Sequence, residues 1–414
     1  MSLSSVLSKQ QENRIFGLDL LRSTAILLVL YSHGFDPFLA EYFPKLRSLI
    51  FMDGVDLFFV LSGFLIGLIL IKQFEKKSDY TFLPIFSFWK RRWMRTLPNY
   101  YFVFFVILFV PVIVPFFRGN SPAIPFEIWS SFLLFSQNLF KPQANFFLEA
   151  WSLAVEEWFY LITPIILWLF HKVFKKILIK KWIFLLMIFT VLLVSIIFRY
   201  QVGLSLNGKI AEWDSHIRRV VFIRLDSIMY GVLGAFLKFY FPVLWGKKSL
   251  FPYMNLMGII CLFITHYAYL EAIDNNTNVF MNTIYFSVSG MGVMFLLPQI
   301  DSLKEPPKYG ITKIMSKIIT HISLISYSLY LTHSYLILGH FIRYKNQYFD
   351  KYLPHTPLIS ILYFISYLLV SILISTILYY TVEITFINKR TQETNIVKIK
   401  SQIHISAINN HINQ

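Results

Sequence analysis

The chain has 414 residues, of which 56% are hydrophobic and only 14% are charged, whereas ordinary soluble domains carry about 25% charged residues. This composition excludes a soluble globular protein and indicates a polytopic membrane protein. The formal charge of +16 does not indicate nucleic-acid binding, because the basic residues are dispersed in short segments between apolar runs, where they report membrane orientation.

Ten apolar stretches, each close to the ~20 residues that a bilayer span requires, follow a polar segment at 1–13. The predicted spans lie near 16–35, 49–71, 97–117, 151–170, 182–198, 220–240, 250–270, 279–298, 321–342 and 358–387. The apolar stretch at 126–140 is short, and we expect an interfacial or re-entrant piece there. The sequence therefore predicts an all-α polytopic membrane protein of about ten transmembrane helices, with a membrane domain over 14–387 and a polar tail over 388–414.

The basic residues predict the orientation of these spans. With the N-terminus in the cytoplasm, the segments that face inward hold more than twice as many Lys and Arg residues as those that face outward, as the positive-inside rule requires. Both termini are therefore predicted to be cytoplasmic. The first apolar stretch shows no signal-peptide cleavage pattern, and we expect it to be retained as the first span.

That first span carries Asp19, Arg22 and His33 among apolar residues. A charged side chain near the centre of a membrane helix costs on the order of 3 kcal/mol or more, so such a group usually has a function. Arg22 and His33 are eleven positions apart, which on a helix puts them on nearly the same face and roughly 16 Å apart along the axis. The spacing predicts a cation and an imidazole that face one shared space at two depths.

The fourth span begins with a motif that contains Glu156 and Glu157, and the predicted topology puts both at about the depth of His33. A carboxylate beside a histidine in a low-dielectric site can fix its tautomer and stabilise the imidazolium, so His33 is a candidate general base oriented by Glu156. A histidine hydrogen-bonded to a neighbouring helix for packing alone is equally compatible with the pattern.

Arg92 and Arg95 are three positions apart and share a helical face, with Lys90 and Arg91 beside them. Guanidinium groups suit phosphate, which they bind in bidentate fashion. Ordinary positive-inside charge in contact with lipid headgroups is the simpler interpretation of this cluster. Arg22, buried on the same side, favours a phosphate-bearing ligand that enters from the cytoplasm.

Other polar residues lie in the remaining spans. Asp53 and Asp56 share a face at the outer end of the second span, where they could bind a hydroxyl or cap the helix, and Gly63 and Gly67 form a small-x-x-x-small surface for close helix contact. His333 stands in the ninth span, between the predicted depths of Arg22 and His33. We expect Arg224 to pair with an acidic neighbour; Asp226 lies two residues on, and Glu383 falls near the inner end of the last span. A single cysteine, Cys261, provides neither a disulfide nor a zinc site, and no metal is predicted.

Taken together, these stretches resemble the integral-membrane acyltransferase-3 family, the O-acetylases of surface polysaccharides. The resemblance rests on Arg22 and His33 with ten residues between them and on the motifs at 54–67, 91–98, 151–160 and 327–333, in the same order and on the same predicted helices as in the family. It covers nearly the whole chain. Each motif alone is weakly specific, whereas four in order are specific.

The resemblance implies a bacterial inner-membrane enzyme that takes an acetyl group from acetyl-CoA on the cytoplasmic side to a glycan hydroxyl on the far side. It implies that His33 is essential and that Arg22, Arg92 and Arg95 serve the function, and it places the family's glutamate at Glu156. From the resemblance together with the chemistry of the residues, we predict catalytic roles for His33 and Glu156, donor binding by the three arginines, and supporting or substrate-binding roles for Asp53, Asp56, Glu157 and His333. Many relatives carry an additional extracytoplasmic esterase-like domain, and we expect this chain to be the stand-alone form. The second hypothesis is a glycolipid transporter or flippase, for which buried charges are also suited, although no repeat of the kind common in transporters is found.

Overall fold

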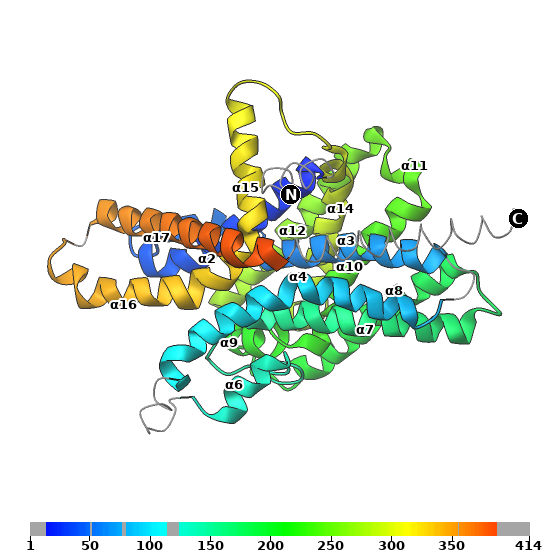
Figure 1. Ribbon diagram of the computed structural model, residues 1–414, viewed down its shortest axis with the longest axis horizontal. Helices are drawn as coiled ribbons and strands as arrows, with labels where there is room; N and C mark the ends of the chain where they lie inside the picture. The colour runs from blue at the N-terminus through cyan, green and yellow to red at the C-terminus, as the bar shows by residue number, and fades with distance from the viewer. Residues whose placement is uncertain (1–13, 50–51, 77–79, 114–123, 355, 387–414) are drawn as a thin grey trace, which may run out of the picture.

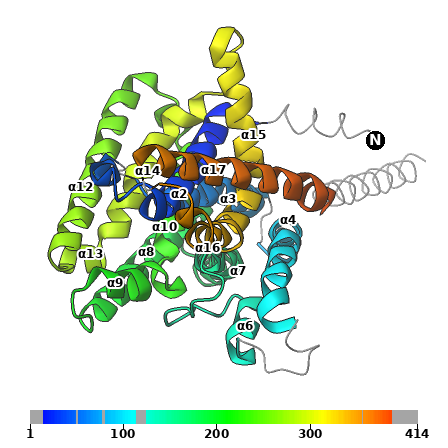
Figure 2. The same ribbon diagram turned by 90° about the vertical axis from the view of Figure 1, so that its left-hand side faces the viewer.

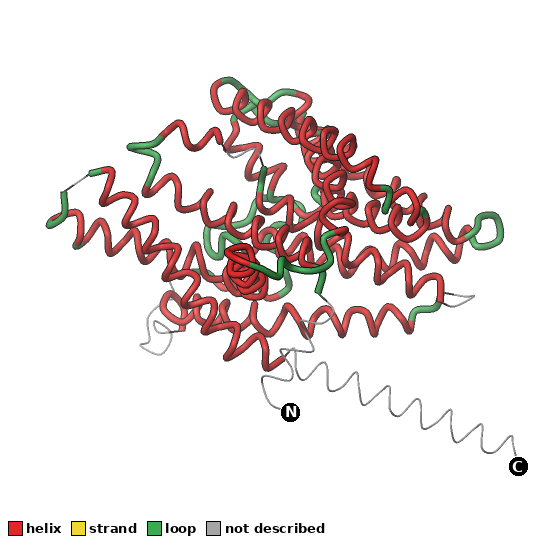
Figure 3. The backbone as a smooth tube through the Cα atoms, turned by 90° about the horizontal axis from the view of Figure 1, so that it is seen from above, coloured by secondary structure: helices red, strands yellow, loops and turns green. Residues whose placement is uncertain are grey.

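The computed structural model describes residues 14–49, 52–76, 80–113, 124–354 and 356–386. Within these ranges the protein is helical, with no strand (Figure 3). The predicted polar segments at 1–13 and 388–414 lie outside the described residues. The α helices are α2 (Phe16–Phe38), α3 (Gly54–Lys76), α4 (Leu83–Leu108), α6 (Phe126–Leu133), α7 (Ala150–Phe174), α8 (Lys180–Gly203), α9 (Ile210–Trp213), α10 (Leu225–Tyr240), α11 (Pro242–Trp245), α12 (Phe251–Asp274), α13 (Val279–Thr283), α14 (Tyr285–Ser302), α15 (Gly310–Thr332), α16 (Gly339–Gln347) and α17 (Pro357–Leu378).

Short segments of other helical types connect or extend these helices. Four are 3₁₀ turns, namely η1 (Pro44–Leu49), η4 (Val221–Ile223), η5 (Lys248–Leu250) and η7 (Phe349–Lys351). Four are π-helical, namely η2 (Phe109–Ile113), η3 (Asp214–Arg218), η6 (His333–Leu338) and η8 (Tyr379–Glu383). The predicted interfacial piece at 126–140 contains only the eight-residue α6.

Among the described residues, 6 helices are long and apolar enough to cross a membrane. They span Gly54–Lys76, Ala150–Phe174, Lys180–Gly203, Lys248–Asp274, Gly310–Gln347 and Pro357–Phe386. The all-α membrane architecture is thus supported, whereas the predicted count of ten is not confirmed.

The other four predicted spans coincide with α2, α4, α10 and α14. For two of these helices the reason why they do not count as long, apolar membrane-crossing helices is clear: α4 carries too many charges and α10 is too short. The first half of α4 carries Lys90, Arg91, Arg92 and Arg95, so these basic residues lie on the same helix as the predicted third span. Helix α10 has only 16 residues, because the chain before it forms the 3₁₀ turn η4. A helix whose ends or faces are covered by neighbours needs less apolar length than one that faces lipid.

Helix α3 lies at the centre of the bundle, where it contacts α2, α7, α10 and α14 (Figure 1). Its contact with α10 is a contact between backbones. A Cβ atom added at Gly63 would lie 1.8 Å from the Ile228 carbonyl oxygen, and one added at Gly231 would lie 2.0 Å from the Val60 carbonyl oxygen. The predicted close packing through Gly63 is therefore confirmed, and only glycine fits there.

Gly63→Ala is expected to destabilise the protein by about 1–3 kcal/mol or more, because the new methyl group forces α3 and α10 apart. Thermal unfolding of the purified protein in detergent measures the change. Gly339→Ala is the matched control, since the nearest atom to an added Cβ there is 3.8 Å away. Equal stability of the two variants would contradict this account of the helix contact.

Large apolar side chains point outward from several helices. Phe189 and Leu193 on α8, Phe263 on α12, and Leu369 and Leu373 on α17 are all exposed. In water such a surface would aggregate, whereas in a bilayer lipid tails cover it.

The first half of α15 also stands away from the other helices in both views (Figures 1 and 2).

Candidate active site in the transmembrane bundle

A cavity of about 120 Å³ lies between α2, α3, α4, α7 and α15. We call it the arginine cavity, because three of its lining residues are the predicted phosphate ligands Arg22, Arg92 and Arg95. Glu156 is the carboxylate in its lining. The structure thus brings together, from two different helices, the three arginines that the sequence analysis connected only through their predicted side of the membrane.

Each arginine of this cavity has a different setting. Arg22 donates to Ser323 Oγ at 3.3 Å and lies 3.6 Å from Asp19 Oδ1. Arg92 lies over the ring of Tyr160, with 6.0 Å from its guanidinium carbon to the ring centroid. Arg95 is exposed and forms no ion pair with another described residue. An exposed, unpaired guanidinium at a cavity wall is suited to an anionic ligand.

Glu156 is held on the arginine side of the bundle. Its Oε2 accepts a hydrogen bond from the Tyr160 hydroxyl at 2.9 Å, and that hydroxyl lies 2.6 Å from Ser62 Oγ on α3. The expected contact between Glu156 and His33 is therefore absent from the described residues. The reason is that α2 and α3 are staggered along the bundle. Gly54, at the start of α3, packs against Ala25 of α2, so His33, about two turns further along α2, lies beyond the first residue of α3. Ser62, by contrast, lies about two turns inside α3.

A second cavity of about 210 Å³ opens beside α2, η3, α12 and α14. We call it the histidine cavity, because its lining includes His33, which is exposed. The same lining holds the carboxylates Asp36, Asp53 and Asp214, together with Arg218, and the aromatic residues Trp213, Tyr269 and Tyr285. Carboxylates with aromatic residues in one cavity can bind hydroxyl-rich ligands through polar groups and ring faces.

The ring of His33 contacts the ring of His333, the first residue of η6. The distance from His33 Nδ1 to His333 Nε2 is 2.7 Å, and the two rings are nearly parallel. His333 is fully buried, whereas His33 faces the histidine cavity. His333, predicted at a depth between Arg22 and His33, therefore meets His33 directly through its ring.

The arginine cavity and the histidine cavity are adjacent but separate. Val55 lines both. Tyr330 lines the arginine cavity, with its hydroxyl 2.5 Å from Ser152 Oγ and its ring centroid 5.7 Å from that of His333. Arg22 and His33 thus line different cavities, and the prediction of one shared space is corrected to two adjacent spaces, with Val55 and Tyr330 in the wall between them.

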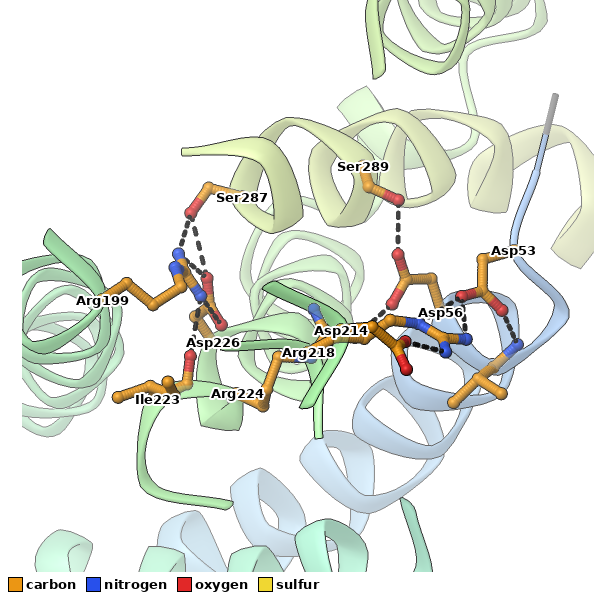
Figure 4. Close-up of polar contacts among 11 residues, drawn as sticks. Asp53, Asp56, Arg199, Asp214, Arg218, Ile223, Arg224, Asp226, Ser287 and Ser289 are labelled. Atoms are coloured by element: carbon orange, nitrogen blue, oxygen red, sulfur yellow. Dashed lines mark hydrogen bonds and ion pairs between the residues drawn. The ribbon is translucent and has the colours of Figure 1, made fainter. Parts of the chain in front are cut away.

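Asp53 and Asp56 share a helical face in the sequence but differ in the structure (Figure 4). Asp53 lines the histidine cavity, accepts the Val55 N–H at 2.8 Å at the start of α3, and pairs with Arg218 at 2.6 Å. Asp56 is buried, and its two oxygens accept from Arg224 at 2.5 Å and Ser289 at 2.8 Å. Asp53 therefore remains a candidate for substrate contact, whereas Asp56 connects α3 to α14 and to the residue before α10.

A further buried ion pair was missed by sequence analysis. Arg199 of α8 donates to both carboxylate oxygens of Asp226 at 2.7 Å, and both side chains are 0% exposed (Figure 4). Ser287 also donates to Asp226 at 3.0 Å. Arg199 stands just after an apolar run, so the sequence analysis placed it in an outward-facing loop, while the structure keeps it inside the last turns of α8.

Two other buried carboxylates lie outside both cavity linings. Glu157, predicted to support the site, is buried, and its Oε2 has no hydrogen-bond partner among the described residues. Glu383 accepts hydrogen bonds from Ser328 at 2.6 Å and Asn99 at 3.2 Å. Among the described residues, no group of His, Cys, Asp and Glu side chains is arranged to hold a metal ion.

Comparison with known families identifies the class of protein. The family model described as an acyltransferase domain, that of the acyltransferase-3 family, matches residues 15–380. The chain therefore belongs to this family of acyltransferases, as its motifs indicated. The match runs from α2 into η8 and so includes every residue that lines the two cavities.

Several curated proteins are similar to the chain. They include the peptidoglycan O-acetyltransferase OatA of Listeria monocytogenes (38% identical over 30% of this chain and 21% of the relative) and the O-acetyltransferase OatA of Staphylococcus aureus (29% over 56% and 36%). A putative O-acetyltransferase of Staphylococcus aureus is 27% identical over 77% of this chain and 50% of its own length. These matches thus span at most half the length of the relatives. No solved structure matches the chain.

Proposed function

We propose that the chain is a membrane O-acetyltransferase of the bacterial cytoplasmic membrane. It transfers an acetyl group from cytoplasmic acetyl-CoA to a hydroxyl of an extracytoplasmic or lipid-linked glycan. The observation that carries this proposal is the adjacency of the two cavities, one lined by three arginines and the other by an exposed histidine. The relatives named as O-acetyltransferases support it.

The donor site is the arginine cavity. Coenzyme A is a phosphorylated head on a long, thin arm, and guanidinium groups bind phosphate through paired charge-assisted hydrogen bonds. We assign Arg22, Arg92 and Arg95 to the phosphates. The arm then extends toward the wall, where the thioester has to pass Val55 and Tyr330 to reach His33.

The reaction takes place at His33. As the acceptor oxygen attacks the thioester carbonyl carbon, His33 accepts the hydroxyl proton. The new C–O bond forms, the C–S bond breaks, and the coenzyme A thiolate leaves and takes up a proton. In the rival path the imidazole attacks first, and an acyl-histidine delivers the acetyl group to the hydroxyl in a second step.

The acceptor site is the histidine cavity. Peptidoglycan sugars are candidates because of the Listeria relative, and O-antigen and exopolysaccharide hydroxyls have the same chemistry. Asp53 and its neighbouring carboxylates can accept hydrogen bonds from further hydroxyls of the sugar.

Reconstituted protein, incubated with acetyl-CoA labelled in the acetyl group and with isolated glycans, tests the proposal. Label recovered on glycan as a base-labile ester supports it. Movement of unmodified glycolipid across the membrane without label transfer would instead support a transporter, and would overturn the enzyme proposal.

Arg95→Ala is expected to raise KM for acetyl-CoA roughly 10-fold, with a smaller effect on kcat, because a charge-assisted hydrogen bond is worth about 1.5–3 kcal/mol. Steady-state kinetics at varied acetyl-CoA concentration measure it. Arg91→Ala is the matched control, since Arg91 is exposed on the same helix and does not line the cavity. If both variants change KM equally, the effect comes from overall positive charge rather than from a donor site.

A further inference from the structure

The two rings of the histidine pair have different hydrogen-bond surroundings. His333 Nδ1 lies 2.8 Å from the Tyr330 carbonyl oxygen and 3.1 Å from the Leu329 carbonyl oxygen, and its Nε2 lies 2.7 Å from His33 Nδ1. The contact with His333 is the one hydrogen bond that the His33 ring forms with the described residues. Both nitrogens of His333 are therefore engaged, while Nε2 of His33 has no protein partner in the described structure.

These contacts assign the protons. A carbonyl oxygen can only accept, so His333 Nδ1 must carry a hydrogen. The ring of His333 is fully buried and no described carboxylate contacts it, so the ring is neutral, because an unpaired buried charge is costly. In a neutral imidazole the other nitrogen is an acceptor, so His333 Nε2 accepts and His33 Nδ1 donates.

We propose that His333 is a positioning residue that holds His33 in the tautomer with hydrogen on Nδ1. The lone pair of His33 is then on Nε2, which is the atom available to take a proton from an acceptor hydroxyl. This inference rests on the proposed function, in which His33 is the base, and assigns to His333 the orienting role that the sequence analysis gave to Glu156.

The backbone around His333 fits this role. The chain changes from the α helix α15 to the π-helical segment η6 at His333, and π segments within helices occur frequently at functional sites. The carbonyl groups of Leu329 and Tyr330, four and three residues earlier, both face Nδ1. The backbone therefore fixes the His333 tautomer, and His333 in turn fixes that of His33.

Nitrogen-15 NMR of histidine-labelled protein in bilayers tests the tautomer directly, without any need for activity. The chain has 10 histidines, so the His33 signals are assigned by their loss in His33→Gln. We expect hydrogen on Nδ1 of His33 in the wild type and a mixture of tautomers in His333→Leu. Hydrogen on Nε2 of His33 in the wild type would overturn the inference.

Kinetics provide the second arm, with three replacements of His333. In His333→Gln the amide oxygen can take the place of Nε2 as acceptor, whereas His333→Asn is too short and His333→Leu has no acceptor. We expect kcat to fall roughly 10–100-fold in the Asn and Leu variants, which is a part of the 10²–10⁴-fold that a general base contributes. KM for both substrates should stay within about twofold of the wild-type value. In the Gln variant kcat should largely recover.

The two arms separate this inference from the proposed function. Equal loss of kcat in the Gln, Asn and Leu variants would overturn the acceptor role of His333. If Leu fails to insert, the comparison of Gln with Asn alone decides, because both are polar. If the wild type transfers no acetyl group, the proposed function fails, and the NMR result still decides whether His333 sets the tautomer.

Discussion

His33→Gln is expected to lower the rate of acetyl transfer by roughly 10²–10⁴-fold, the contribution of a well-placed general base. His33 lines the histidine cavity, and its ring nitrogen Nε2 has no protein partner among the described residues. The amide of glutamine cannot accept the hydroxyl proton. Its size and polarity are close to those of histidine, so the packing of the cavity wall is preserved. The loss should therefore be in kcat, with little change in stability.

His340→Gln is the matched control for this experiment. His340 of α16 is exposed and lines neither the histidine cavity nor the arginine cavity. This variant should keep most of the activity. A His33→Gln protein that is inserted, folded and as active as the wild type would remove His33 from the reaction.

The wild-type protein and the His33→Gln variant together distinguish direct transfer from the path through an acyl-histidine. Wild-type protein incubated with labelled acetyl-CoA and no acceptor, then denatured, carries label on His33 only if an acyl-histidine forms. Direct transfer leaves no label. Trapped label in the wild type that is absent from His33→Gln would establish the covalent path.

Arg199→Met is expected to destabilise the protein by about 3–5 kcal/mol, because it leaves Asp226 buried without its counter-ion. The pair is fully buried and connects α8 to α10, with Ser287 of α14 bonded to both side chains. A loss of this size is a large part of the stability of a typical domain. Unfolding of the detergent-solubilised protein by heat or denaturant measures it.

The double variant Arg199→Met with Asp226→Leu should recover much of this loss, since replacing a whole buried pair with apolar residues is often nearly neutral. Lys308→Met is the control, because Lys308 and Glu305 form an exposed pair, and exposed pairs contribute about 0–1 kcal/mol. If Arg199→Met is no more damaging than Lys308→Met, the buried pair does not stabilise the bundle as argued.

These buried pairs also shape the histidine cavity. The pair between Arg224 and Asp56 and the pair between Arg199 and Asp226 fix α3, α8 and the start of α10 against one another (Figure 4). Arg218, six residues before Arg224, reaches Asp53 at the cavity wall. Stability and site geometry are therefore coupled at this end of the molecule.

The sequence alone determined the all-helical membrane architecture and the family, and it predicted the residue types of the candidate site. Apolar runs of bilayer length, ionisable residues inside them, and ordered motifs are local properties that need no coordinates to be recognised. The close contact through Gly63 was also predictable, because small residues four apart on one face favour direct helix packing.

Only the tertiary structure decided which of these residues meet. The sequence analysis estimated the depth of each residue by counting along its helix, which assumes that all helices start at the same depth in the membrane. In this bundle the helices are staggered, so Glu156 is hydrogen-bonded to Tyr160 beside the arginines, while His33 contacts His333. Helix ends, π segments and tilts depend on contacts between residues far apart in sequence. The pairing of a charge or an imidazole with its partner is fixed by those contacts, and no local pattern contains them.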